Sequence, residues 1–265
     1  MNFMALNDDK VDVFPDAKAL TLAAARRIAS LANSAVEDHG VFAIALSGGS
    51  TPSALYSLMA TDEAIRSKMP WPKVHFFFGD ERHVSPEHVE SNFRMANEAM
   101  FKALGRNDLH IHRILGELTS ASEAAQQYEA DLGEFFEPRG LLTHGLPRFD
   151  LILLGMGPDG HTASLFPNSS GLLETTRWVA ANWVEKFKTD RITMTFPVLN
   201  SAAEVIVLVS GAEKAAILAK VLDEATGGTI YPVQAVRPRD GIKRWMLDAP
   251  AAACIGKTQG ESVHR

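Results

Sequence analysis

Asp159 and His161 stand two residues apart in the glycine-rich segment GMGPDGH, which follows the apolar run FDLILL. Histidine is the side chain most easily poised as a base near neutral pH, and a neighbouring carboxylate can fix its tautomer. The pair is therefore a candidate for proton transfer. The alternative is structural, with His161 capping a short helix and Asp159 bracing the turn, and the spacing alone is compatible with both.

The same segment matches the G-x-G-x-x-G pattern of dinucleotide-binding loops at Gly155, Gly157 and Gly160. That pattern requires a long helix after the glycines, whereas here HTASLF is followed at once by the breaker cluster PNSSG. Asp159 would also bring negative charge close to a pyrophosphate. We therefore predict that the segment binds no dinucleotide, and we expect no cofactor.

A second segment, SGGSTP, follows the apolar run VFAIAL. Gly48 and Gly49 free backbone N–H groups at the start of a predicted helix, and the hydroxyls of Ser47, Ser50 and Thr51 add donors, so the segment suits a small anion. It lacks the G-K-[ST] ending of a P-loop, so no nucleoside triphosphate is implied. The alternative is a tight strand-to-helix turn with an ordinary Ser/Thr cap.

Charged side chains stand at three further positions. Asp80, Glu81 and Arg82 follow the apolar run VHFFF, where they could serve in proton transfer or form a structural ion-pair cluster. Lys214 lies at the start of a predicted helix, where its charge opposes the helix dipole, which hints at a nearby anion unless the side chain points to solvent. Arg191 precedes ITMTFPVL, and its position alone is not diagnostic.

The sequence lacks the usual frameworks for a metal or a catalytic nucleophile. His83, His88, His110 and His112 belong to no H-E-x-x-H or Cys/His pattern, so we expect solvated histidines and no metal. There is no G-x-S-x-G motif, and Cys254 is the single cysteine, in an Ala-rich stretch.

Composition narrows the class of protein. The 265 residues are 46% hydrophobic and 22% charged, as in ordinary globular proteins, and the net charge of −6 argues against a nucleic-acid partner. No apolar run approaches the roughly 20 residues that span a membrane, so no membrane partner is expected. The single cysteine and the absence of a signal-peptide pattern favour a cytoplasmic location. The oligomeric state stays open.

Apolar runs of strand length alternate with helical patterns along the chain. Strands are predicted over 41–46, 73–80, 149–155 and 204–209, and helices over 17–40, 50–59, 91–104, 120–136 and 212–224. This alternation predicts an α/β fold with a doubly wound, mostly parallel sheet and helices on both faces, in a single domain over residues 1–265. The candidate segments would then meet at the carboxyl ends of the strands.

In chain order, these segments closely resemble the 6-phosphogluconolactonase family. The resemblance rests on ALSGGSTP, FFFGDERHVSPEHVESNFRMA, LILLGMGPDGHTASLFP, RITMTFPVLNSA, GAEKA and the closing YPVQAVRP and LDAPAAA, which cover nearly the whole chain. It implies the Rossmann-like sugar-phosphate isomerase/deaminase fold. It also implies hydrolysis of a sugar-phosphate lactone, 6-phospho-D-glucono-1,5-lactone, to 6-phosphogluconate in the oxidative pentose phosphate pathway.

Two alternatives share the fold. Glucosamine-6-phosphate deaminases have a similar glycine-rich loop and D-G-H turn, but their pattern continues with AFNEP, whereas this chain has ASLFP and no acid. They also have MDEY where this chain has GDER. A non-catalytic sugar-phosphate sensor would keep SGGSTP and Lys214 yet could lose Asp159 and His161, and both are present.

The resemblance also implies roles for individual residues. His161 would be the general base for the water that attacks C1, Asp159 would orient it, and either the backbone around Gly157 to Gly160 or a nearby cation would stabilise the oxyanion. Asp80 would contact sugar hydroxyls or hold Arg82 in place.

Phosphate binding would fall to the glycine-rich turn and to cations around it. The implied ligands are Ser47, Gly48, Gly49, Ser50 and Thr51, with Arg82 and Lys214 as charge partners and Arg191 as a weaker candidate.

Overall fold

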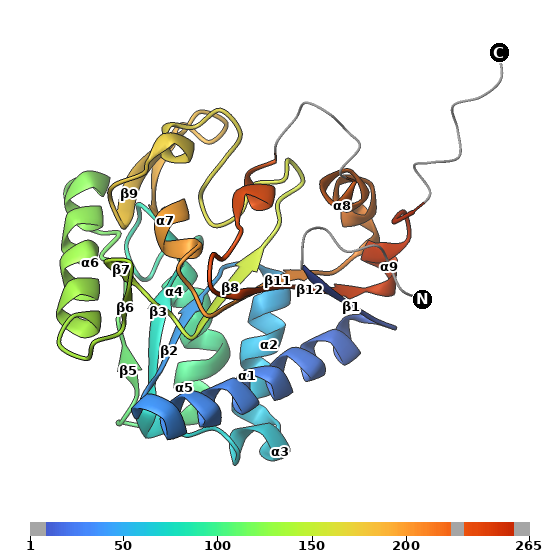
Figure 1. Cartoon of the computed structure of the whole chain (residues 1–265), viewed down its shortest axis with the longest axis horizontal. Helices are drawn as coiled ribbons and strands as arrows, with labels where there is room; N and C mark the ends of the chain where they lie inside the picture. The colour runs from blue at the N-terminus through green and yellow to red at the C-terminus, as the bar shows by residue number, and fades with distance from the viewer. Residues whose placement is uncertain (1–8, 224–230, 257–265) are drawn as a thin grey trace.

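The computed structural model describes residues 9–223 and 231–256, and a seven-stranded sheet forms its centre (Figure 1). The strand order is β1-β12-β11-β8-β2-β3-β5, and all neighbouring strands run parallel. The strands are β1 (Lys10–Phe14), β2 (Phe42–Leu46), β3 (Val74–Phe78), β5 (His110–Ile111), β8 (Leu151–Gly155), β11 (Glu204–Val209) and β12 (Ile242–Asp248). The predicted mostly parallel sheet is confirmed.

Helices cover both faces of the sheet. They are α1 (Ala17–His39), α2 (Ser50–Thr61), α3 (Glu63–Arg66), α4 (Asn92–Ala96), α5 (Lys102–Leu104), α6 (Ala121–Phe136), α7 (Phe196–Leu199), α8 (Ala215–Leu222) and α9 (Ala249–Ala252). The shorter turns are η1 (Trp71–Lys73), the π-helical η2 (Asn97–Phe101), η3 (Ser170–Leu173), η4 (Ala212–Lys214) and η5 (Pro232–Ala235). Figure 1 shows α1, α2 and α5 below the sheet and α7 and α8 above it, which confirms the doubly wound fold.

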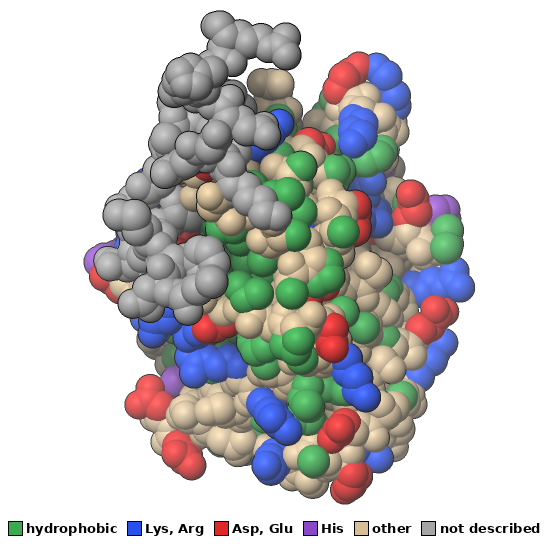
Figure 2. Space-filling model, turned by 90° about the vertical axis from the view of Figure 1, so that its right-hand side faces the viewer, with side chains coloured by type: hydrophobic (Ala, Val, Ile, Leu, Met, Phe, Trp, Pro, Cys, Tyr) green, Lys and Arg blue, Asp and Glu red, His purple; other side chains and the backbone are tan. Residues whose placement is uncertain are grey.

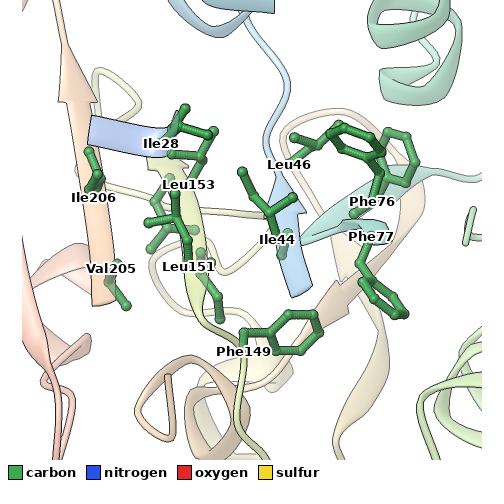
Figure 3. Packing of buried hydrophobic residues seen from close by; sticks show 14 of the residues in the cluster. Ile28, Ile44, Leu46, Phe76, Phe77, Phe149, Leu151, Leu153, Val205 and Ile206 are labelled. Atoms are coloured by element: carbon green, nitrogen blue, oxygen red, sulfur yellow. The ribbon is translucent and has the colours of Figure 1, made fainter. Parts of the chain in front are cut away.

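The core explains why these strands are apolar throughout. Every residue of β2 and β3 is buried, as expected for parallel strands covered on both faces. In Figure 3, Ile44 of β2 lies between Leu151 of β8 on one side and Phe77 of β3 on the other. Most of the buried hydrophobic residues in the described ranges form one cluster, and the single domain over residues 1–265 stays a prediction.

The strand order reverses between β2 and β8. From β2 the chain proceeds to β3 and β5, whereas from β8 it proceeds in the opposite direction to β11 and β12. The segments that leave β2 and β8 therefore diverge, and a crevice opens at the carboxyl ends of these two strands, where open α/β sheets bind ligands.

A second, antiparallel sheet stands beside this crevice. It consists of β4 (Asp80–Arg82), β10 (Thr189–Met194) and β9 (Val179–Val184), in the order β4-β10-β9. Gly79 joins it to the main sheet, because its N–H donates to the Leu46 carbonyl and its carbonyl accepts from the Met194 N–H. A separate two-stranded ribbon is formed by β6 (Leu142–Thr143) and β7 (Leu146–Pro147). The sequence patterns did not predict these sheets.

Charges of both signs are interspersed on the face drawn in Figure 2. Lys and Arg side chains lie among Asp and Glu there, with hydrophobic side chains near the centre. That visible face carries no broad basic surface of the kind that nucleic acid requires. Among the described helices, none is long and apolar enough to cross a membrane.

Three histidines pack together near the β5 edge of the sheet. The ring of His75 lies 4.4 Å from that of His110, and its Nδ1 lies 3.0 Å from Nε2 of His112. Phe135 covers His75 at 4.5 Å between ring centroids. The expectation of solvated histidines is therefore wrong for His112. Burial, followed by the charge of His110, lowers the pKa of His75 to about 3 and that of His112 to about 4.

We expect this cluster to make the protein less stable in acid. The unfolded chain binds these protons near pH 6.5, whereas the folded protein binds them only near pH 3–4, so lowering the pH below 6.5 favours unfolding. Urea denaturation should show the free energy of unfolding falling by about 2 kcal/mol for each of these two histidines between pH 7 and pH 5. The fall should be smaller in His75→Phe. His144→Asn, at an exposed histidine, is the control, and identical falls in wild type and His75→Phe would contradict the prediction.

Candidate active site

A cleft of about 290 Å³ lies at the carboxyl ends of β2, β8 and β11. Its lining includes ten of the residues predicted from the sequence: Ser47, Gly48, Gly49, Ser50, Thr51, Asp80, Arg82, Gly157, His161 and Lys214. The other two, Asp159 and Arg191, lie outside the lining and contact it through His161 and Arg82. The structure thus brings all of these residues to one place, while their roles stay predictions.

The turn after β2 has a shape that needs glycine. Gly49 has φ 111°, in the region that favours glycine, and a Cβ on Gly48 would lie 2.0 Å from the Asn92 Oδ1 atom. The hydroxyl of Tyr56 accepts from the Ser47 N–H and donates to the Ser47 carbonyl, both at 2.9 Å. This buried tyrosine fixes the start of the turn.

The N–H donors at the start of α2 have no side-chain cap among the described residues. α1 and α6 have side-chain caps from Asp16 and Ser120, but the N-terminus of α2 has no side-chain cap. Within residues 9–223 and 231–256, the Ser47 hydroxyl is also buried and has no hydrogen-bond partner. Because Ser50 and Thr51 line the cleft, this helix end offers its N–H groups and positive dipole pole to an anion there.

The turn after β8 holds His161 against a carboxylate. Nδ1 of His161 hydrogen-bonds to Oδ1 of Asp159, and the His161 N–H donates to the same oxygen at 3.3 Å. The ring of Phe166 stacks on the imidazole at 4.0 Å between centroids. Burial alone would raise the pKa of Asp159, but the hydrogen bonds and charge of His161 outweigh it and hold that pKa below its usual value. An ionised Asp159 on Nδ1 leaves Nε2 to accept a proton.

The backbone of this turn is already engaged. The Gly157 N–H donates to the His161 carbonyl at 2.9 Å, and the Gly160 N–H donates to the Gly157 carbonyl at 3.1 Å. Of the two expected sources of oxyanion stabilisation, the geometry therefore favours a cation over these glycine N–H groups. Lys214 reaches the same turn, where its Nζ donates to the Met156 carbonyl at 3.1 Å.

Glu81 is a structural residue and not part of an ion pair with Arg82. Its buried carboxylate accepts hydrogen bonds from the N–H groups of Arg82, Asn92 and Phe93 and from the Ser91 hydroxyl. Burial raises the pKa of Glu81, and these hydrogen bonds oppose the shift. Glu81 therefore anchors the start of α4.

Asp80 is held by two neighbours in the cleft wall. Its Oδ2 accepts from the Ser164 hydroxyl at 2.6 Å, and its Oδ1 accepts from Nδ2 of Asn92 at 3.3 Å. Sequence reasoning missed Ser164 and Asn92 as partners, because the only signal was their presence in the segments that resemble the family.

Arg82 and Arg191 lie opposite each other on β4 and β10. The Nε atoms of both are buried without a hydrogen-bond partner, and among the described residues neither forms an ion pair within 4.0 Å. Burial, followed by the charge of Arg82, lowers the pKa of Arg191, although acidic groups nearby oppose the shift. Two adjacent cations without an ion-paired acid suit a bound anion.

The sequence matches a known protein family over most of its length. The family is that of glucosamine-6-phosphate isomerases and 6-phosphogluconolactonase, and the match covers residues 15–245. The chain belongs to this family. Its fold can therefore be compared with the folds of other members of the family.

Several relatives match it almost from end to end. It is 38% identical to a 6-phosphogluconolactonase of Nostoc over 92% of this chain and 97% of the relative, and 36% identical to one of Synechocystis over 91% and 96%. Among solved structures, the 6-phosphogluconolactonase from Trypanosoma cruzi superposes with a TM-score of 0.80 and 29% identity, covering 96% of this chain and 98% of that one. A glucosamine-6-phosphate deaminase at 19% identity, with a TM-score of 0.73, shares the fold.

We expect Gly157→Ala to displace the His161 ring. A Cβ at this position would lie 2.0 Å from Nδ1 and Cε1 of His161, so the imidazole must move away from Asp159. Gly155→Ala is the matched control, because a Cβ there meets no atom within 4 Å. NMR of ¹⁵N-labelled histidine should show altered His161 ring signals in Gly157→Ala only. Unchanged signals in both variants would contradict this geometry.

Proposed function

We propose that this protein hydrolyses 6-phospho-D-glucono-1,5-lactone to 6-phosphogluconate. The observation that carries the proposal is that His161, which Asp159 holds from behind, shares one cleft with the uncapped start of α2 and with the cations Arg82 and Lys214. A base and an anion-binding surface in one cleft suit a phosphorylated ester. The names of the relatives from Nostoc and Synechocystis support the same substrate.

In this proposal the phosphate binds at the start of α2. The N–H groups of residues 48–51 and the Ser47 hydroxyl surround it, and Arg82 and Lys214 balance its charge. Arg191 adds to the positive potential from its place next to Arg82. Charge-assisted contacts are roughly twice as strong as neutral hydrogen bonds. A few of them can therefore hold a dianion on a protein whose net charge is −6.

The chemistry requires one proton to be moved twice. Nε2 of His161 takes a proton from water as the water oxygen attacks C1, and the ionised Asp159 stabilises the imidazolium that forms. The tetrahedral intermediate then expels the ring oxygen, which takes the proton from His161. A cation of the cleft stabilises the oxyanion, since the Gly157 and Gly160 N–H groups donate within their own turn.

Substitution of His161 tests the base. His161→Gln should lower kcat by about 100- to 10,000-fold with KM within a few-fold of wild type, because only the proton acceptor is removed. Rates are measured as acid release from freshly generated lactone, after subtraction of spontaneous hydrolysis. His144→Asn, at an exposed histidine, should remain active. Normal turnover in His161→Gln would remove this residue from the mechanism.

Substitution of Arg82 tests the phosphate contact. Arg82→Met should raise KM by about 10- to 100-fold and leave kcat within a few-fold, because a charge-assisted contact contributes about 1.5–3 kcal/mol. Arg106→Met, at an exposed arginine paired with Asp108, is the matched control. A fall in kcat alone would assign Arg82 to the oxyanion instead of the phosphate.

One assay separates the proposed activity from that of the deaminases in the same family. The protein is supplied in parallel with 6-phosphogluconolactone and with glucosamine 6-phosphate, and acid and ammonia release are measured. We expect acid release only. Ammonia without acid would overturn the proposal, and binding without either product would indicate a sugar-phosphate sensor.

A further inference from the structure

Two side chains from the turn between β9 and β10, Lys186 and Phe187, contact Asp159 and Phe166, respectively, which hold His161. Lys186 Nζ lies 3.8 Å from Oδ2 of Asp159, the oxygen that His161 does not use. The ring of Phe187 meets the ring of Phe166 edge-on, at 5.8 Å between centroids, and Phe166 stacks on His161. One hairpin thus contacts the pair directly at the Asp159 carboxylate and indirectly at the His161 ring, through Phe166.

The two contacts belong to one local arrangement. Lys186 Nζ lies 5.4 Å from the centre of the Phe187 ring, and the Arg191 guanidinium lies 5.3 Å from the same centre. A groove lined by Asp159, Phe166 and Lys186 separates the hairpin from the turn after β8. The strand that follows this turn, β10, is held in place because it pairs with β4 in the wall of the cleft.

We propose that Lys186 and Phe187 are positioning residues for the catalytic pair, an inference that rests on the proposed role of His161 as the base. The positive charge of Lys186 partly neutralises the Asp159 carboxylate. The carboxylate therefore stabilises the protonated form of His161 less strongly, and the imidazole can release its proton. Phe187 supports Phe166 and thereby keeps the imidazole plane fixed while Nε2 takes and returns its proton.

Other charged groups also face this pair and set the background against which Lys186 acts. Asp80 and Arg82 from β4 and Glu213 and Lys214 after β11 line the cleft with His161. Glu185 lines the groove beside Lys186, but the Glu185 carboxylate pairs with Lys188. Among the described residues, Lys186 is the cation that ion-pairs with Asp159.

Removing the Lys186 charge should move the acid limb of kcat/KM to higher pH. In Lys186→Met, Asp159 stabilises the protonated imidazole with its full negative charge. The unprotonated base therefore disappears at a higher pH, and the acid limb moves up by about 0.3–0.5 pH unit. The shift should shrink in 0.5 M NaCl, because salt screens an exposed charge. Lys186→Arg should restore the wild-type profile. The melting temperature should stay within about 2 °C, because the lysine side chain is 58% exposed and such pairs add little stability.

Lys188→Met is the matched control, since it removes the same charge from the same turn at a residue that pairs with Glu185. It should leave the profile unchanged. Phe187→Ala should lower kcat about 3- to 10-fold with KM within twofold, and Phe187→Tyr, which keeps the ring, should restore kcat. Equal shifts in the two lysine variants, or no shift in Lys186→Met, would overturn the role of Lys186. Wild-type kcat in Phe187→Ala would overturn that of Phe187.

NMR titration of the His161 ring in the free protein separates this inference from the proposed function. The pH midpoint should rise in Lys186→Met whether or not the lactone is the substrate. If wild type fails to hydrolyse the lactone while this midpoint rises, the proposed function fails and the charge coupling stands. If wild type is active and the midpoint does not move, the inference about Lys186 fails.

Discussion

The adjacency of β2 and β8 at the centre of the parallel sheet is the constraint on which the site depends. The strand order reverses between these two parallel strands, so the turns that follow them diverge and leave a crevice. One turn brings the uncapped start of α2 to that crevice, and the other brings the His161–Asp159 pair. The start of α2 and the His161–Asp159 pair are thereby separated in sequence by more than a hundred residues and brought together by the pairing of β2 with β8.

The cleft contains polar groups whose burial lowers the stability of the folded protein. Arg82 and Arg191 are adjacent and lack an ion-paired acid among the described residues, and the hydroxyl of Ser47 is buried without a partner. Buried polar groups of this kind cost free energy unless a ligand satisfies them. The surrounding core of the α/β sheet offsets that cost. A phosphorylated ligand would supply the missing partners at the point where the protein leaves them open.

The antiparallel sheet contributes a second layer to the site. Through β4 and β10 it places Arg82 beside Arg191, and through the turn after β9 it brings Lys186 to Asp159 and Phe187 to Phe166. Its connection to the main sheet depends on Gly79, whose N–H and carbonyl bond to different sheets. The parallel sheet thus carries the turns that line the cleft, and the hairpin between β9 and β10 adds the contacts of Lys186 and Phe187.

The sequence by itself determined the fold class and ten of the residues that line the cleft. Continuous apolar runs bounded by Gly49, Gly79 and Gly157 mark strand ends, because strands buried on both faces tolerate few polar residues. Local spacing could not separate a catalytic His161 from a capping one; the family resemblance favoured catalysis. Tertiary structure alone decided that Glu81 anchors α4, that Arg82 faces Arg191 and that Lys186 reaches Asp159. These contacts join segments far apart in the chain, and periodicity carries no information about which distant side chains a fold brings together.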